Sequence, residues 1–233
     1  MAVAEVQTAN AQSVSGAAIT MTPGAGFTAG NTIVIGIVYY QSAATPLSIS
    51  SVTNQSATPV TYSEPSTQRF ATDTGLNFIL IQNVPSGTTG LIVTMSGAPA
   101  FGSNWVLGEY SGLVTSGTDG ASSLSASAST TTDAVTSGTA SNTVQPAAVI
   151  GIATDSAFNT IPIAGTGFTS NVGIGALRLE FKRITAIGSQ AATFTNNHGS
   201  ACNHITAMVV LDEPGGGGAT SKLLRMLNNQ AGF

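Results

Sequence analysis

The run from Thr32 to Tyr40 is apolar at both sets of positions that alternate along an extended chain. Isoleucine and tyrosine occupy all of the odd positions, and Val34, Val38 and Tyr40 occupy most of the even ones. Side chains of a strand point alternately to opposite faces, so this pattern predicts a strand that is covered on both faces. The run at 76–82 has the same character. A fold for this chain must therefore cover both faces of a sheet.

Turn signals separate many further short strands along the chain. Strands are expected at 76–82, 91–95, 105–110, 147–153, 176–184 and 204–211, and also at 5–9, 17–21, 47–53, 60–63 and 192–195. Gly, Pro, Asn and Ser clusters lie between them, for example at 23–24 and 85–87. Many short strands joined by such turns are typical of an all-β sandwich or barrel.

Charged residues make up only 7% of the 233 residues, and the formal net charge is −4. An average soluble domain has about 25% charged residues. An apolar content of 42% with so small a net charge argues against disorder. Six Lys and Arg residues are too few for a nucleic-acid-binding surface, and the longest apolar run is too short for a transmembrane helix. We predict neither nucleic acid nor a membrane as partner.

The single cysteine, Cys202, cannot form a disulfide within the chain. A chain of this length can bury a core without disulfides. The first residues, Met1 to Val6, lack the basic and apolar regions of a signal peptide. We therefore expect either that the protein does not use this secretion route or that a signal was removed and a start Met added.

A faint internal repeat runs through the chain. Aligning Asn104 with Asn203 places Trp105 on His204 and pairs 77–97 with 178–197, and 31–40 resembles 146–155. Each half would then hold a covered strand, a hairpin and a closing strand. One interpretation is a pseudo-two-fold fold. The other is that hairpin-rich sequences resemble one another through composition alone.

The composition divides the chain into three parts. We expect a β-sandwich domain at 1–214, a glycine-rich tether at 215–219 and a C-terminal docking tail at 220–233. Within the domain, Ser, Thr, Ala and Gly dominate 114–143. This stretch is either a linker or a pair of polar edge strands, and the alternation of Ser with small apolar residues favours strands.

The tail has the pattern of a short amphipathic helix that begins near Ser221. A helix of this length is marginal alone in water, because isolated helices need about 12–15 residues. We predict that the tail docks into an apolar groove of a neighbouring subunit or capsid shell, the alternative being its own sandwich. The residues expected to dock are Leu223, Leu224, Leu227, Phe233, Lys222 and Arg225.

Several motifs together resemble a known module. They are Ala29-Gly30-Asn31 before the covered strand, Glu109-Tyr110-Ser111-Gly112 at a strand end, AAVIGIATD at 147–155 and a closing strand that begins near Cys202. The chain over residues 3–212 resembles a β-sandwich module that recurs in uncharacterised phage virion proteins and bacterial surface proteins. The resemblance implies a two-sheet antiparallel, jelly-roll-like sandwich on the outside of a virion or cell. It supplies no catalytic residues.

The densest reactive cluster is His198, Cys202 and His204. Cys202 and His204 share a face of the predicted strand, and with His198 they include ligands suitable for zinc or copper. A buried thiol and a core histidine are the simpler interpretation, so we predict no metal and no cofactor. Glu109 is the best carboxylate for glycoside hydrolysis, and the simpler interpretation is an outward polar residue that alternates with the core. No nucleophile, base and orienting group occur together, so we predict no enzyme activity.

Carbohydrate binding is the main rival function, because a β-sandwich can present aromatic rings to sugars. The available rings are Tyr39, Tyr40, Tyr62, Tyr110 and Trp105. Core packing is the default role of Trp105. The alternating strands predict a core that contains Trp105, Leu107, Ile33, Ile35, Ile79, Ile81, Ile92, Ile150, Ile152, Leu179 and Val209.

Few charges, small side chains and scarce lysine suit a protein whose surface is covered by identical neighbours, because exposed sheet edges are usually protected by Lys or Pro. We predict a non-enzymatic virion structural protein, most specifically a phage capsid decoration (cement) or minor head protein. Its expected partners are copies of itself and a major capsid or other virion protein. The alternative is a carbohydrate-binding module of a phage tail or bacterial surface protein, and the third hypothesis is an extracellular filament subunit. The predicted location is the virion, or otherwise the cell exterior.

Overall fold

The computed structural model describes residues 2–41, 46–69, 74–128, 132–156, 161–197 and 202–214. Every regular element in these ranges is a β-strand, and every strand pair is antiparallel. The predicted all-β antiparallel sandwich is therefore confirmed. Alternating apolar side chains form the strands, and glycines with positive φ such as Gly30 and Gly87 form turns between them.

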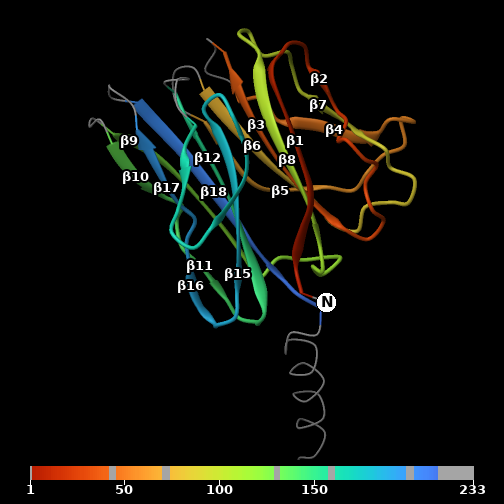
Figure 1. Cartoon of the computed structure of the whole chain (residues 1–233). Helices are drawn as coiled ribbons and strands as arrows, with labels where there is room; N and C mark the ends of the chain where they lie inside the picture. The colour runs from red at the N-terminus through yellow and green to blue at the C-terminus, as the bar shows by residue number, and fades with distance from the viewer. Residues whose placement is uncertain are drawn as a thin grey trace, which may run out of the picture.

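The first half of the chain forms two sheets (Figure 1). The larger sheet contains, in spatial order, β1 (Ala4–Val14), β8 (Ser103–Ser111), β3 (Thr32–Tyr40), β6 (Thr74–Ile81) and β5 (Ser63–Arg69). The smaller sheet contains β2 (Ala18–Met21), β7 (Leu91–Met95) and β4 (Ile49–Asn54).

The second half forms a matching pair of sheets. The larger contains β9 (Gly120–Ala128), β18 (Cys202–Asp212), β12 (Ala147–Asp155), β15 (Leu177–Ile184) and β14 (Thr169–Ile174). The smaller contains β10 (Thr132–Thr136), β17 (Thr193–Asn197) and β13 (Ile163–Ala164). A separate pair joins β11 (Ala140–Asn142) to β16 (Gly188–Gln190). The Ser/Thr-rich stretch thus contains strands, as expected.

The second half repeats the strand order of the first. Strands β9, β18, β12, β15 and β14 correspond to β1, β8, β3, β6 and β5, and β10, β17 and β13 correspond to β2, β7 and β4. Each half has eight such strands when β11 and β16 are left out. Counted along the chain, the first, eighth, third and sixth strands of a half share one sheet, and the second, seventh and fourth share the other. This is the strand order of a jelly roll. The fifth strand extends the larger sheet. The pseudo-two-fold repeat is therefore confirmed, with β11 and β16 as an addition.

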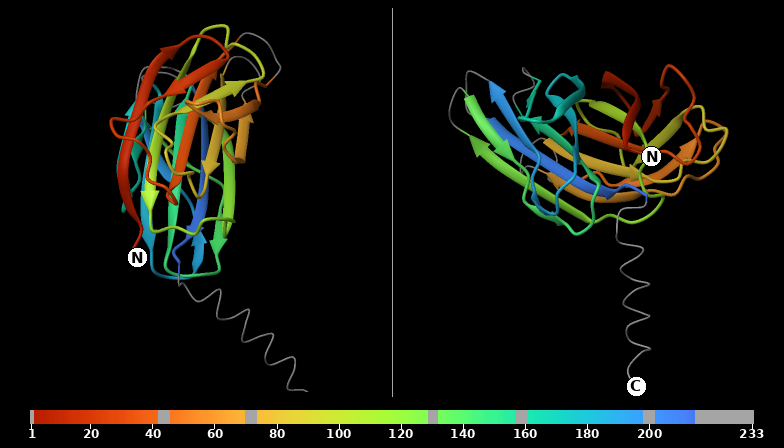
Figure 2. Two further views of the ribbon diagram at one scale, coloured as in Figure 1. Left: turned by 90° about the vertical axis from the view of Figure 1, so that its right-hand side faces the viewer. Right: turned by 60° about the horizontal axis from the view of Figure 1, so that its bottom comes forward.

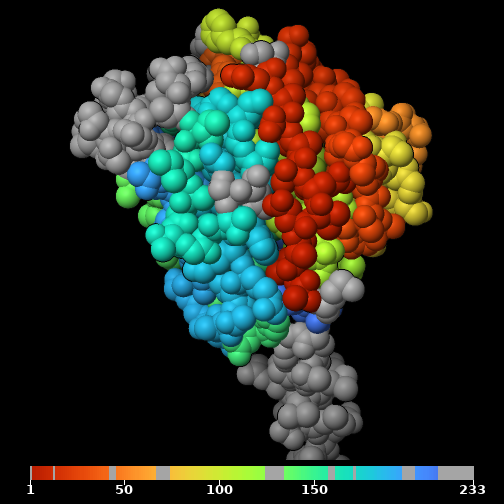
Figure 3. Space-filling model, viewed as in Figure 1, coloured from red at the N-terminus to blue at the C-terminus, as the bar shows by residue number. Residues whose placement is uncertain are grey.

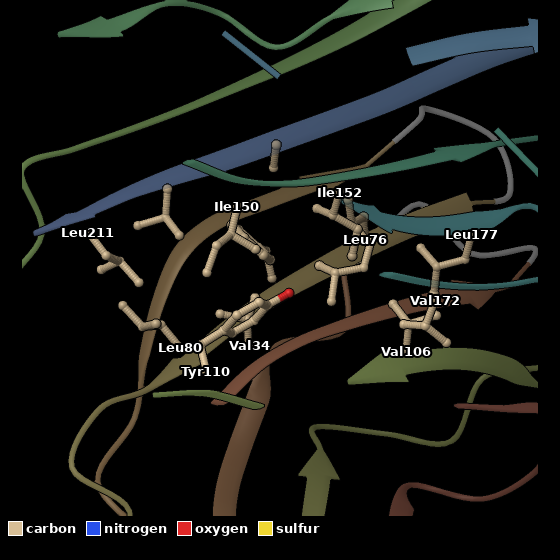
Figure 4. Close-up of a cluster of buried hydrophobic side chains, with 14 of the residues drawn as sticks. Val34, Leu76, Leu80, Val106, Tyr110, Ile150, Ile152, Val172, Leu177 and Leu211 are labelled. Carbon is tan, nitrogen blue, oxygen red and sulfur yellow. The ribbon is translucent and has the colours of Figure 1, made fainter. Parts of the chain in front are cut away.

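The sheets stack in four layers, with the two five-stranded sheets in the middle (Figure 2). A central core joins these two sheets, and Figure 4 shows Val34, Leu80 and Val106 of the first half packed near Ile150 and Ile152 of the second. Two further cores lie between each large sheet and its small sheet. The doubly apolar strands β3, β6 and β12 are buried along their whole length, because each lies in a middle layer.

The predicted core residues are all buried except Ile92. Trp105, Leu107, Ile33, Ile35, Ile79 and Ile81 lie in the core beneath the first small sheet, whereas Ile150, Ile152, Leu179 and Val209 lie in the central core. Ile92 is half-buried on β7, whose neighbours Leu91 and Val93 point inward. The expectation for Ile92 was wrong, because a strand of an outer layer buries only one of its faces.

The two similar runs 31–40 and 146–155 do not occupy equivalent positions. A side chain at Gly36 would point toward Ile152 across the central core, whereas one at Gly151 would point toward Ala192 beneath the small sheet. Aligned residues of the two runs therefore point to opposite sides of their sheets, and the residue-by-residue match of these runs is wrong. Trp105 and His204, which the alignment also matches, do point the same way. Both lie on the side of their closing strand that faces the small sheet.

Gly36 allows the two halves to approach each other. A Cβ atom at this position would overlap Cδ1 of Ile152. We expect Gly36→Ala to lower the free energy of unfolding by about 1–3 kcal/mol, as overpacking of a core does. Ile152→Val removes the overlapping methyl group, so the double variant should be more stable than the sum of the single effects.

Urea unfolding followed by circular dichroism measures the four free energies of this cycle. Gly24→Ala is the matched control, because a Cβ there meets no atom within 4 Å. Additive effects of Gly36→Ala and Ile152→Val would contradict the close approach of the two sheets at this point.

Candidate functional site

The residues predicted to dock a partner lie outside the described residues. These are Leu223, Leu224, Leu227, Phe233, Lys222 and Arg225, together with the tether at 215–219. The structure does show how the domain ends before them. Glu213 donates its backbone N–H to the carbonyl oxygen of Pro146 at 3.0 Å, and its carboxylate pairs with the Arg183 guanidinium at 2.5 Å. The end of β18 is thus held to the sheet.

The three metal-ligand candidates are not all described. His198 lies outside the described residues, and only the backbone of Cys202 is described, at the start of β18. His204 is buried, with 1% of its surface exposed, and lies opposite Asp155 of β12. No group of three or more His, Cys, Asp and Glu side chains comes together in the part of the chain that the structure describes. Like Trp105, His204 is buried on the side of its closing strand that faces the small sheet.

Glu109 is fully buried on β8, so the interpretation as an outward polar residue was wrong. One carboxylate oxygen accepts hydrogen bonds from Nδ2 of Asn31 at 2.7 Å and from the backbone N–H of Thr28 at 2.8 Å. The other oxygen accepts from Nε2 of Gln7 at 2.6 Å. Each oxygen of Glu109 is therefore occupied by protein donors that fix the loop before β3 and the edge strand β1. This arrangement is typical of a structural carboxylate and not of a catalytic acid.

The two most recognisable sequence motifs meet in this hydrogen-bonded group. Asn31 of the Ala29-Gly30-Asn31 motif binds the carboxylate of Glu109, the first residue of the Glu-Tyr-Ser-Gly motif. Gly30 has a φ of 83° and donates its N–H to Val84 O at 2.9 Å, which turns the chain into β3. The motifs therefore have a shared structural role at one end of the first jelly roll.

A second buried carboxylate, Glu180 of β15, was not identified from the sequence. Its oxygens accept the backbone N–H groups of Gly165 at 2.9 Å and Thr193 at 3.2 Å, and so link the second large sheet to its small sheet. Burial raises the pKa of Glu180 to about 7, although these two N–H groups oppose the rise. A perturbed carboxylate can mark a functional site, but the side chain of Glu180 has no exposed surface.

Most of the aromatic rings considered for sugar binding are buried. Tyr39, Tyr110 and Trp105 have at most 3% of their surface exposed, and Tyr40 has 8%. Only Tyr62 is half-buried, and its hydroxyl donates to Ile49 O at 3.1 Å. Tyr62 packs against the core beneath the first small sheet and also lines a hollow between the turn after β6 and the segment that connects the two halves.

The two small sheets present outer faces that are almost without charge. Their strands β2, β4, β7, β10, β13 and β17 contain one charged residue, Asp133. The side chains on the outer faces are mostly Thr, Ser and Ala, with Ile92 half-buried and Ile163 57% exposed. A surface designed to be soluble carries about 25–35% charged residues. These faces are therefore unusual for a surface that contacts only water.

Comparison of the chain with models of known protein families, with curated proteins and with solved structures gave no match. In the described residues, no helix has the length and apolar character needed to cross a membrane. The function is therefore inferred from the fold and from the side chains described above.

Proposed function

We propose that the protein is a non-enzymatic structural subunit of a virion, most specifically a capsid decoration or minor head protein that assembles with copies of itself. The nearly uncharged outer faces of the two small sheets carry this proposal. A lone charge in six outer strands suits surfaces that are covered by neighbouring subunits, since interface cores are depleted of charged residues.

The arrangement of the sheet edges supports the same role. Edge strand β1 lies beside edge strand β14 of the other half, as the space-filling view in Figure 3 shows, and β5 lies beside β9. These contacts place the edges of the two large sheets against each other, although no strand pairing joins them. In the small sheets, the edge of β4 is bridged by the segment around Pro59, whereas β2, β10 and β13 pair on one side only among the described strands. Assembly through the small sheets would cover both their faces and their edges.

The jelly-roll order gives a weaker argument, based on analogy of fold. Jelly rolls occur in viral capsid proteins and in lectins, and a fold by itself does not define a function. The predicted tail fits the structural role, since a segment beyond Pro214 can reach another virion protein while the domain remains complete.

Sedimentation velocity tests the assembly. We expect the full chain to form a defined oligomer, and Ile92→Lys or Thr195→Lys, each on the middle strand of a small sheet, to shift it to monomer. Ser86→Lys, on an exposed turn, is the matched control and should leave the oligomer unchanged. A monomer at all concentrations, or an oligomer insensitive to both outer-face variants, would contradict assembly through these faces.

Immunogold labelling with antiserum against the protein tests the virion location in a lysate of the producing organism. Periodic labelling of particles supports the proposal, and labelling confined to cell surfaces or filaments overturns it. A chain that ends at Pro214 should melt like the full chain but no longer bind these particles. Retained binding by that shorter chain would exclude the tail as the docking segment.

A further inference from the structure

A shallow groove lies on the first jelly roll, beside the segment that connects the two halves. One part of it, of about 280 Å³, is lined by Thr61, Gln82, Asn83 and Thr115 together with Pro59, Val60 and Pro85. A second part, of about 160 Å³, shares Thr61, Gln82 and Thr115 and extends to Tyr62 and Ser116. The two parts are therefore continuous. Three segments build the groove, namely the approach to β5, the turn after β6 and the connection between the halves.

We propose that this groove binds a neutral carbohydrate. The proposal does not depend on the virion role, because it rests on the side chains that line the groove and not on the outer faces of the small sheets. It follows from the chemistry of the lining side chains and from the way in which the fold holds them in place.

The lining combines one aromatic ring with hydroxyl and amide groups, and it contains no charged residue. Hydroxyl and amide side chains can both donate and accept hydrogen bonds, as sugar hydroxyls do. The Tyr62 ring offers an apolar surface for the C–H face of a sugar. An anionic ligand would need a cation that the lining lacks. A neutral sugar has hydroxyl groups for the polar side chains of the lining and a C–H face for the aromatic ring.

The polar groups of the groove are held in place by the fold. Nε2 of Gln82 donates to Val114 O at 3.2 Å and to Gly117 O at 2.9 Å, which fixes the connecting segment and leaves Oε1 of Gln82 without a donor among the described residues. Asn83 has a φ of 58°, and the next residue, buried Val84, donates its N–H to Asn31 O at 3.0 Å. The exposed amide of Asn83 is therefore displayed on a fixed turn. Preorganised polar groups lower the cost of binding.

A printed array of neutral, sialylated, sulfated and phosphorylated oligosaccharides, probed with the labelled full chain, tests the proposal. We expect binding to one or more neutral glycans. Tyr62→Ala should reduce that signal at least tenfold, whereas Tyr62→Phe, which keeps the ring, should stay within twofold. Phe101→Ala removes a 71% exposed aromatic ring that does not line the groove and should also leave the signal unchanged.

Asn83→Gly is the second test variant, because glycine accepts the positive φ while the amide is removed. It decides the outcome if circular dichroism shows that Tyr62→Ala does not fold, and we expect it to lose at least tenfold of the signal. The proposal is overturned if no neutral glycan binds, if only charged glycans bind, or if Asn83→Gly and a folded Tyr62→Ala bind like the parent. A change of oligomeric state in the groove variants, without glycan binding by the parent, would also overturn it and indicate an interface between copies.

Discussion

Replacing Glu109 with alanine should lower the free energy of unfolding by about 3 kcal/mol, because donors left without an acceptor cost roughly 1–3 kcal/mol each when buried. The side-chain amide of Asn31 and the N–H of Thr28 both lose their acceptor in this variant. The loop before β3 and the N-terminal part of β1 should loosen with it. Urea unfolding measures the loss, and amide hydrogen exchange at Thr28 should rise more than exchange at Ile35 in the centre of β3.

Glu109→Gln provides the matched control. A glutamine oxygen in place of the carboxylate oxygen that binds Asn31 and Thr28 keeps those two hydrogen bonds, and only the bond from Gln7 must rearrange. The expected loss is about 1 kcal/mol, the usual value of one hydrogen bond. If Glu109→Ala is as stable as Glu109→Gln, the carboxylate does not hold this loop. A glycosidase role would instead predict normal stability with loss of hydrolysis in both variants.

The layers of the fold were predictable where the strand pattern is unambiguous. The strand β3 is apolar on both faces and does lie in a middle layer, and the same pattern identified β6 and β12. The internal repeat was also visible, because each closing strand places a large buried residue, Trp105 or His204, on the side that faces its small sheet. Local alternation carries this information directly.

The number of layers and the facing of single residues were not predictable from the same pattern. Gly36 and Gly151 occur in nearly identical runs and face opposite ways, since facing depends on strand register and on which sheets pack together. Ile92 was assigned to the core because its strand LIVTM is apolar at most positions. Whether another layer covers the outer face of this strand depends on tertiary packing, and the sequence of the strand alone does not reveal it.

The buried carboxylates were missed or misread for a related reason. Glu109 and Glu180 alternate with apolar neighbours, as solvent-facing residues of a two-layer sandwich would. Their burial depends on loops and strands distant in sequence, such as the 24–31 loop for Glu109 and Thr193 for Glu180. The groove beside the connecting segment has the same origin, since Tyr62, Gln82 and Ser116 come from three separate segments. Of the five aromatic candidates, only the structure could show that Tyr62 borders a hollow.

Trp105→Ala should be the most destabilising single substitution considered for this protein, with a loss of about 3–5 kcal/mol from the cavity that it leaves. Trp105 is 3% exposed, lies opposite Ala11 and Ile37 on the neighbouring strands, and fills the core beneath the first small sheet. Because it is the only tryptophan, its own fluorescence cannot follow the variant, so urea unfolding must be monitored by far-UV circular dichroism.

Trp105→Phe separates packing from hydrogen bonding at the same position. The buried Nε1 of Trp105 has no hydrogen-bond partner among the residues that the structure describes, and an unpaired buried polar group costs about 1–3 kcal/mol. Phenylalanine removes that group and keeps an aromatic ring, so the smaller ring and the lost N–H have opposing effects. We expect Trp105→Phe to remain within about 1 kcal/mol of the parent, because these effects largely cancel. If Trp105→Ala also melts like the parent, Trp105 is not part of the core, and its ring becomes available for the sugar-binding role that we have proposed for Tyr62.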